Sequence, residues 1–400
     1  MKIVFVSNYF NHHQSSISEE FHKATKGQYT FIQTMPMEEE RKKMGWNDAI
    51  TPVYVKKSYL STDSHSACME LIDTADVVIF GSAPEKMIKK RIRDNKLTFR
   101  YSERIYKKKS QLIQLPFRFI KYHFNNFPYS NVYLLSASAY ASADYAKTFN
   151  FINKAYTWGY FPETKSYDDI EKIIRQKAKA SILWCARFID WKHPEIPVQV
   201  AKKLKDEGYQ FKMTMIGDGP LFNKISSMIN EQNLTENIIL TGAMSPEQVR
   251  NHMEQAEIFL FTSDRNEGWG AVLNEAMNSA CAVIASHEIG SVPYLLKNKE
   301  NGLVYEGTNI DDIFSKTKFL LDHIPFRQNL GKKAQITIVE HWNSTNAVNR
   351  FISLSTFLQK KEEKKTTLFE EGLCSKAPHL KSKWFSKEEN GKASVIDNGV

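Results

Sequence analysis

The fold is indicated most clearly by the segment FLFTSDRNEGWGAVLNEAMNSACAVIAS, residues 259–286. One apolar run over 256–262 and a second over 281–286 each have the length and composition of a buried strand. Between them lie a polar loop that contains glycines and a stretch long enough for a helix. This strand–helix–strand order is typical of a βαβ unit and therefore predicts a parallel sheet.

Similar units precede this segment. Three further strands are predicted at 181–186, 211–216 and 237–241, and each is followed by a stretch of helical length. Helix starts are marked by Pro194 and by residues 245–248, a capping box with proline at its first helical position. Five apolar runs with intervening helices predict a doubly wound domain over 175–342.

The first half of the chain has the same alternation in weaker form. Strands are predicted at 3–7, 75–80, 97–101 and 132–135, so we expect an α/β domain over 1–165. A final helix is predicted over 345–358, within the segment 343–360. Residues 361–400 are charged and without periodicity, which predicts a flexible tail. The alternative is a docking segment that uses Leu368, Phe369, Trp384 and Phe385.

The composition excludes several classes of protein. The chain has 400 residues, 42% hydrophobic and 25% charged, which is globular composition and too long for one ordinary domain. Its four cysteines are irregularly spaced, so neither a disulfide framework nor a zinc site is expected. We find no signal peptide and no run of about 18 apolar residues, and we therefore expect a cytoplasmic protein.

The net charge of +9 is concentrated in one region. Residues 85–124 contain thirteen Lys or Arg against three acids, a local charge of +10, interleaved with aromatic and aliphatic side chains. Such a basic patch indicates an anionic partner: nucleic acid, a phosphorylated substrate or an acidic membrane. A solvated helix face above buried aromatics is the alternative.

Cations and glycines follow the predicted strands of the second half, where ligands bind to open parallel sheets. Arg187 and Lys192 follow the first of these strands and could clamp a diphosphate; two solvated surface cations are the alternative. Gly217 permits a tight turn after the next strand. Met244 lies in a loop that could present backbone groups to a base.

The most specific pattern is the run Glu267, Gly268, Trp269, Gly270 and, eight residues after the first acid, Glu275. The glycines expose amides at a helix start, where backbone donors and the helix dipole favour a phosphate. Glu267 could then accept hydrogen bonds from sugar hydroxyls, and Glu275 could reach a ribose diol. A helix-capping acid with a second, solvated acid is the alternative.

Taken together, these segments resemble one known family. Residues 182–204, 213–221, 237–249 and 259–286 are similar, in order and at the same spacing, to motifs of the retaining family 4 of glycosyltransferases. The resemblance implies the α/β GT-B fold, in which two Rossmann-like doubly wound domains face a cleft. It also implies that the helix of 343–360 crosses back to the first domain.

The resemblance assigns roles to individual residues. Arg187 and Lys192 match the pair that neutralises the donor diphosphate, and Glu267 matches the acid that holds the donor sugar. Glu275 matches the acid that holds the ribose, and Gly268 to Gly270 match the amides at the helix start. The family needs no metal or cofactor, and the chain has no Asp-x-Asp motif.

The implied function is retaining transfer of a sugar from a UDP- or GDP-sugar to a saccharide or lipid-linked acceptor. Cell-surface polysaccharide synthesis and peripheral contact with the inner face of an anionic membrane are expected, without nucleic acid as a partner. A nucleic-acid-binding protein and a sugar phosphorylase of the same fold are the alternatives. Tyr294 and Ala280 depart from the family pattern, and roles for Glu103, His12 and His13 stay open, as do donor, acceptor and oligomeric state.

Overall fold

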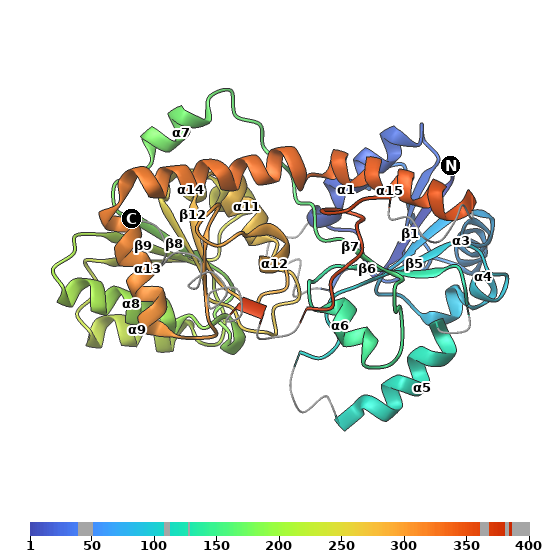
Figure 1. The fold of residues 1–400 in the computed structure, drawn as a ribbon, viewed down its shortest axis with the longest axis horizontal. Coiled ribbons are helices and arrows are strands. Elements are labelled where there is room, and N and C mark those ends of the chain that lie inside the picture. The colour runs from blue at the N-terminus through green and yellow to red at the C-terminus, as the bar shows by residue number, and fades with distance from the viewer. Residues whose placement is uncertain (39–50, 108–112, 127–128, 361–367, 381–383, 386–400) are drawn as a thin grey trace, which may run out of the picture. The chain divides into compact units, whose positions relative to one another are not determined.

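The chain forms two units in the computed structural model, which describes residues 1–38, 51–107, 113–126, 129–360, 368–380 and 384–385 (Figure 1). Unit 1 combines Met1–Glu163 with His341–His379, and unit 2 combines Thr164–Glu340 with Leu380–Val400. Each unit is built on a parallel sheet of its own. The expected α/β architecture with two doubly wound sheets is therefore confirmed.

Unit 1 contains a seven-stranded sheet in the order β3-β2-β1-β4-β5-β6-β7. Its strands are β1 (Ile3–Ser7), β2 (Tyr29–Gln33), β3 (Val55–Lys57), β4 (Val77–Phe80), β5 (Thr98–Ser102), β6 (Val132–Ser136) and β7 (Ala155–Thr157). Its helices are α1 (His12–Ala24), α3 (Thr62–Thr74), η1 (Glu85–Met87), α4 (Lys89–Arg93), α5 (Leu115–Asn126), α6 (Ala141–Ala146) and α15 (Ser344–Lys360). All five residues of β1 are buried, as expected for a central strand of a parallel sheet.

The last long helix, α15, packs on unit 1. The ring of its Phe351 lies 5.4 Å from Phe21 of α1, 5.0 Å from Phe99 of β5 and 5.7 Å from Trp158, measured between ring centroids. Burial of this aromatic cluster holds the helix against α1. The chain therefore returns to its first domain after completing the second, as predicted for the segment 343–360.

The prediction of a flexible tail over 361–400 is wrong for the segment 373–377. The amide of Cys374 donates to the carbonyl of Thr157 at 2.9 Å, and the amide of Thr157 donates to the carbonyl of Ser375 at 2.8 Å. Leu373 and Cys374 are buried. Strand β7 ends the order of its sheet, and an edge strand has free backbone groups that this segment satisfies. Residues 361–367, 381–383 and 386–400 lie outside the described residues.

Unit 2 contains a six-stranded parallel sheet in the order β10-β9-β8-β11-β12-β13. Its strands are β8 (Ser181–Cys185), β9 (Lys212–Ile216), β10 (Ile238–Gly242), β11 (Ile258–Phe261), β12 (Ala282–Ser286) and β13 (Leu303–Tyr305). Its helices are α7 (Ile170–Gln176), η3 (Asp190–Lys192), α8 (Glu195–Asp206), α9 (Phe222–Glu231), α10 (Pro246–Gln255), α11 (Val272–Asn278), α12 (Val292–Leu295), α13 (Ile310–Asp322) and α14 (Ile324–Ile336). A π-helical turn, η4 (Thr337–His341), follows α14.

The strand order of unit 2 reverses between β8 and β11. The chain runs outward from β8 through β9 to β10, and then continues from β11 on the other side of β8. Such a reversal opens a crevice beyond the carboxyl ends of the two central strands, where open α/β sheets bind their ligands. The loops after β8 and β11 therefore border the crevice in which a ligand is expected.

Lys177 links the ends of two helices near this sheet by hydrogen bonds. Its ammonium group donates hydrogen bonds to the carbonyls of Met253 and Ala256 at the end of α10, and to that of Ser279 at the end of α11. Carbonyls at a helix C-terminus lack partners within the helix and carry partial negative charge, which a cation satisfies. Because α11 follows the β11 loop, this lysine also helps to fix the position of that loop.

Candidate functional site

Two loops adjoin at the carboxyl edge of the unit 2 sheet, where the strand order reverses. The loop after β8 leads into η3, and the loop after β11 covers residues 262–271. The hydroxyl of Thr262 donates to the carbonyl of Lys192 at 2.7 Å, and the amide of Asp264 donates to the carbonyl of Trp191 at 3.0 Å. These bonds join the two loops into one surface.

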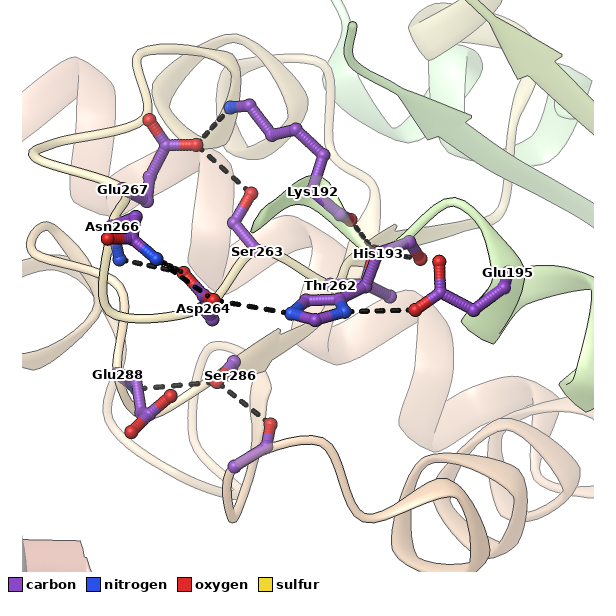
Figure 2. A network of polar contacts seen from close by, with 11 residues as sticks. Lys192, His193, Glu195, Thr262, Ser263, Asp264, Asn266, Glu267, Ser286 and Glu288 are labelled. Atoms are coloured by element: carbon purple, nitrogen blue, oxygen red, sulfur yellow. Dashed lines mark hydrogen bonds and ion pairs between the residues drawn. The ribbon is translucent and has the colours of Figure 1, made fainter. Parts of the chain in front are cut away.

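Lys192 and Glu267 form an ion pair across this junction, as Figure 2 shows. The hydroxyl of Ser263 donates to the same carboxylate oxygen of Glu267 at 3.0 Å. Both charged side chains are only 14% exposed. The sequence predicted that Lys192 and Glu267, which follow different strands, bind the same ligand. The structure brings their charged groups together.

His193 bridges the same two loops on the other side of Lys192 (Figure 2). Its ring nitrogens lie 2.9 Å from a carboxylate oxygen of Glu195 and 3.4 Å from one of Asp264. The hydrogen bonds with Asp264 and then Glu195 raise the pKa of His193 to about 9, so the ring is cationic at neutral pH. Sequence reasoning missed this bridge.

Arg187 lies in the loop after β8, with its guanidinium 5.9 Å from the ring centroid of Trp191. Within the described parts of the chain it forms no ion pair. The preceding and following residues are held by the β9 loop, since the amides of Ala186 and Phe188 donate to the carbonyls of Ile216 and Asp218. The loop that presents Arg187 is therefore fixed by its backbone.

Two glycines allow close packing around the site: Gly217 lets the β9 loop approach the β8 loop, and Gly270 lets the β11 loop fold back on Phe261. Gly217 has a φ of +134°, and a Cβ there would lie 1.9 Å from the carbonyl oxygen of Ala186. Gly270 has a φ of +85°, and a Cβ there would lie 2.4 Å from the ring of Phe261. Larger residues are excluded at both positions. Met244 lies partly exposed between β10 and α10.

The remaining predicted residues of this loop have different environments. The indole of Trp269 is fully buried and donates to the side-chain oxygen of Asn274 at 2.9 Å, so it belongs to the core and not to a ligand-facing surface. Gly268 is also buried, and α11 begins only at Val272, two residues after Gly270. Backbone amides of this loop thus precede the helix instead of forming its first turn.

Glu275 lies within α11. Burial raises the pKa of its carboxyl group, and Arg250 acts in the opposite direction. Burial, and after it the negative charge of Glu275, raises the pKa of the Cys185 thiol at the end of β8, so Glu275 lies near the central strand. Glu275 itself is half-buried, and its role as the ribose-binding acid stays a prediction.

The residues of unit 1 whose roles the sequence left open, His12, His13 and Glu103, lie after β1 and β5. Asn11 caps α1 by accepting a hydrogen bond from the amide of His13, and burial lowers the pKa of His12. Glu103 accepts a hydrogen bond from the hydroxyl of Tyr160 at 2.8 Å and pairs with Lys107 at 3.0 Å. These contacts account for Glu103 within unit 1 and assign no ligand to it.

Three arginines of the basic patch at residues 85–124 are structural, and for these three the prediction of an anionic partner is wrong. Arg91 is fully buried and donates to the carbonyls of Ile72, Ala75, Asp76 and Leu97. Arg100 pairs with Glu85 at 2.9 Å, and Arg104 with Asp144 at 3.6 Å. These three arginines are buried where backbone carbonyls and carboxylates need donors, so they contribute no accessible charge for a nucleic acid.

The described residues contain no cluster of three or more His, Cys, Asp or Glu side chains arranged to hold a metal ion. In the same residues no helix has both the length and the apolar character needed to cross a bilayer.

The second half of the chain is similar to a known protein family. Residues 166–337 match the family described as Glycosyl transferases group 1. This segment belongs to that family. The match includes both loops of the site, from Arg187 to Glu275.

Two curated relatives show the same partial match. Poly(ribitol-phosphate) alpha-N-acetylglucosaminyltransferase of Staphylococcus aureus is 27% identical over 170 residues, which are 42% of this chain and 34% of the relative. A diphospho-undecaprenol 4-alpha-N-acetylgalactosaminyltransferase of Campylobacter jejuni is 27% identical over 154 residues, 38% of this chain and 40% of the relative. The chain thus matches well under half the length of either relative.

A solved structure matches over nearly its whole length. Anabaena HepE in complex with UDP has a TM-score of 0.66 and 14% sequence identity, covering 90% of this chain and all of HepE. At this identity the likeness shows the fold alone. The group 1 segment is thus one of two Rossmann-like domains of GT-B type, as the sequence predicted.

Proposed function

We propose that the chain is a retaining glycosyltransferase that moves a sugar from a UDP- or GDP-sugar to a saccharide or lipid-linked acceptor. The observation that carries this proposal is the position of the Lys192–Glu267 pair. It lies at the carboxyl edge of the group 1 domain, at the strand reversal, with Arg187 in the same loop as Lys192. That edge is where such sheets bind ligands.

Lys192 and Glu267 must exchange their ion pair for contacts with the donor when a donor binds. The oxygens of a diphosphate carry more negative charge than a single carboxylate. They therefore attract both the Lys192 ammonium and the Arg187 guanidinium. Glu267 is then released to accept hydrogen bonds from hydroxyls of the donor sugar. The ion pair thus keeps both side chains extended and partly desolvated before the substrate arrives, which reduces the cost of ordering them.

In the reaction the bond between the anomeric carbon and the diphosphate oxygen breaks as the acceptor oxygen bonds to the same face of that carbon. The acceptor proton passes to the departing diphosphate. Arg187 and Lys192 stabilise the negative charge that develops on the leaving group. These two cations supply the neutralisation that a metal ion would otherwise provide, so we propose that transfer is metal-independent.

The acceptor is proposed from the relatives. The Staphylococcus aureus enzyme is named for transfer to poly(ribitol-phosphate), and the Campylobacter jejuni enzyme for a sugar linked to diphospho-undecaprenol. The first name describes a polymer and the second a lipid-linked saccharide. We therefore propose a role in bacterial capsule, exopolysaccharide or O-antigen synthesis, with peripheral contact at the inner face of the cell membrane.

Release of UDP or GDP from a panel of nucleotide sugars tests the proposal. Glu267→Gln keeps the size of the side chain but loses its charge, and removing contacts of about 3–4 kcal/mol lowers the rate by roughly two to three orders of magnitude. Lys192→Met weakens diphosphate binding as well. Lys179→Ala, which removes an exposed lysine of unit 2, is the control. Full activity of both site variants would contradict the assignment.

A further inference from the structure

Helix α5 exposes a continuous apolar stripe. Ile113 precedes the helix, and Phe117, Ile120 and Phe124 follow at intervals of four, three and four residues, which places them on one helical face. Their side chains are 82%, 79%, 54% and 70% exposed, respectively. Single exposed apolar residues are common, but three large ones on one face of α5, with a fourth just before the helix, mark a binding surface.

The opposite face of α5 is attached to unit 1. The ring of Tyr122 packs on Tyr145 with centroids 5.1 Å apart, and Asn126 accepts a hydrogen bond from Arg100. Arg118 donates to the carbonyl of Ile105, and its guanidinium lies over Tyr106. The helix is therefore fixed through this face, and Figure 1 shows it, in teal, standing out from the body of unit 1.

The segment that carries the stripe contains no acidic residue. No Asp or Glu occurs between Glu103 and Asp144, whereas six Lys or Arg do. Of these, Lys121 is exposed on α5 itself. A hollow of about 520 Å³ brings both kinds of side chain together, since it is lined by Ile105, Gln114, Phe117, Arg118, Lys121 and Tyr122. Aromatic and cationic groups thus share one concave surface.

We propose that the α5 surface, defined as Ile113, Phe117, Ile120, Lys121 and Phe124, binds the headgroup region of an anionic phospholipid bilayer. The apolar stripe enters the boundary between headgroups and acyl chains, while the exposed Lys121 contacts lipid phosphates. An amphipathic helix with a large apolar face and flanking cations lies in the membrane plane in this way. A second copy of this chain offers the same cationic surface and does not complement its charge.

This inference specifies the membrane contact included in the proposed function, but it is tested without any sugar transfer. The full chain is sedimented with vesicles of phosphatidylglycerol and phosphatidylcholine, and with vesicles of phosphatidylcholine alone, in the absence of nucleotide sugar. We expect co-sedimentation with the anionic vesicles only, weakened by high salt because the phosphate contacts are screened.

Two variants separate the apolar and electrostatic contributions. The double substitution Phe117→Ser/Phe124→Ser should lower the vesicle partition coefficient by at least about tenfold, because two aromatic rings no longer enter the bilayer. Lys121→Glu should lower it by about tenfold for anionic vesicles. The matched controls are Val53→Ser, which removes a side chain that is 79% exposed elsewhere in unit 1, and Lys179→Glu.

Each result has a definite reading. Binding by the controls but not by the α5 variants, with circular dichroism unchanged and UDP or GDP release on soluble acceptors retained, supports the inference. No binding to either vesicle, or equal binding by all variants, overturns it. A dimer in sedimentation velocity that Phe117→Ser/Phe124→Ser abolishes would also overturn it, because the stripe would then be an interface between copies. Loss of sugar transfer alone, with vesicle binding intact, would contradict only the proposed function.

Discussion

Neutralising His193 should destabilise the chain in a pH-dependent way. The imidazolium of His193 is held between the carboxylates of Glu195 and Asp264, and its pKa is raised from 6.5 to about 9. A shift of that size corresponds to at most about 3.4 kcal/mol. Glu195 is 36% exposed and solvent screens the pair, so we expect about 1–2 kcal/mol.

The variant must respect the backbone of His193, whose φ of +51° is left-handed. His193→Asn is suitable because asparagine tolerates this conformation and stays neutral. Because the pKa is raised in the folded chain, the stabilisation is fully present below about pH 6.5 and is lost as the pH rises through about 9.

Urea-induced unfolding of both proteins, followed by tryptophan fluorescence at pH 6 and at pH 10, measures this difference. The variant should be less stable at pH 6 and equal to the wild type at pH 10. Since this bridge joins the loops that carry Lys192 and Glu267, the difference reports on the site directly. A loss of stability that is the same at both pH values, or an imidazole that titrates near 6.5 by NMR, would refute the reasoning.

Three further predictions follow from the same loops and their surroundings. Ala280 has a φ of +54° after α11, so Ala280→Gly should raise the free energy of unfolding in urea by up to about 1 kcal/mol; a decrease would argue against backbone strain. Gly217→Ala should cost about 3 kcal/mol in the same assay because of its clash with Ala186, whereas Gly208→Ala, with a φ of +82° and no atom within 4 Å, should cost about 1 kcal/mol. Saturating EDTA should leave UDP or GDP release intact, and a loss restored by manganese would show that Arg187 and Lys192 are not sufficient.

The long buried strands were predictable because their residues are apolar on both faces. Strand β1 was predicted at its observed bounds, and β8, β9, β10 and β12 within about one residue of theirs. Strands β2, β3, β7 and β13 were missed. Strand β2 has five residues, but its sequence YTFIQ mixes polar and apolar residues and gives a weaker signal than an apolar run. Strands β3, β7 and β13 have only three residues each and are defined by their pairing with a neighbouring strand. The pairing of residues 373–377 with β7 was missed for the same reason: it depends on an open sheet edge and not on local sequence.

The part of the candidate site that lies directly after strands was predictable from the sequence. Lys192 and Glu267 could be placed on one sheet edge, and the order of β8 and β11 brings them together. The bridge from His193 to Asp264 depends on a left-handed backbone at His193, for which histidine gives little signal. The burial of Trp269 depends on the close approach of Gly270 to Phe261, which only the folded loop shows.

We propose that the carboxyl edge of unit 2 holds a nucleoside diphosphate between the loops after β8 and β11. Hydrogen–deuterium exchange of the full chain with and without UDP or GDP tests it most directly. We expect slower exchange of backbone amides in peptides covering 186–193 and 262–275, and loss of that protection in Lys192→Met. Unchanged exchange in both peptides at saturating UDP and GDP, or protection confined to unit 1, would contradict it.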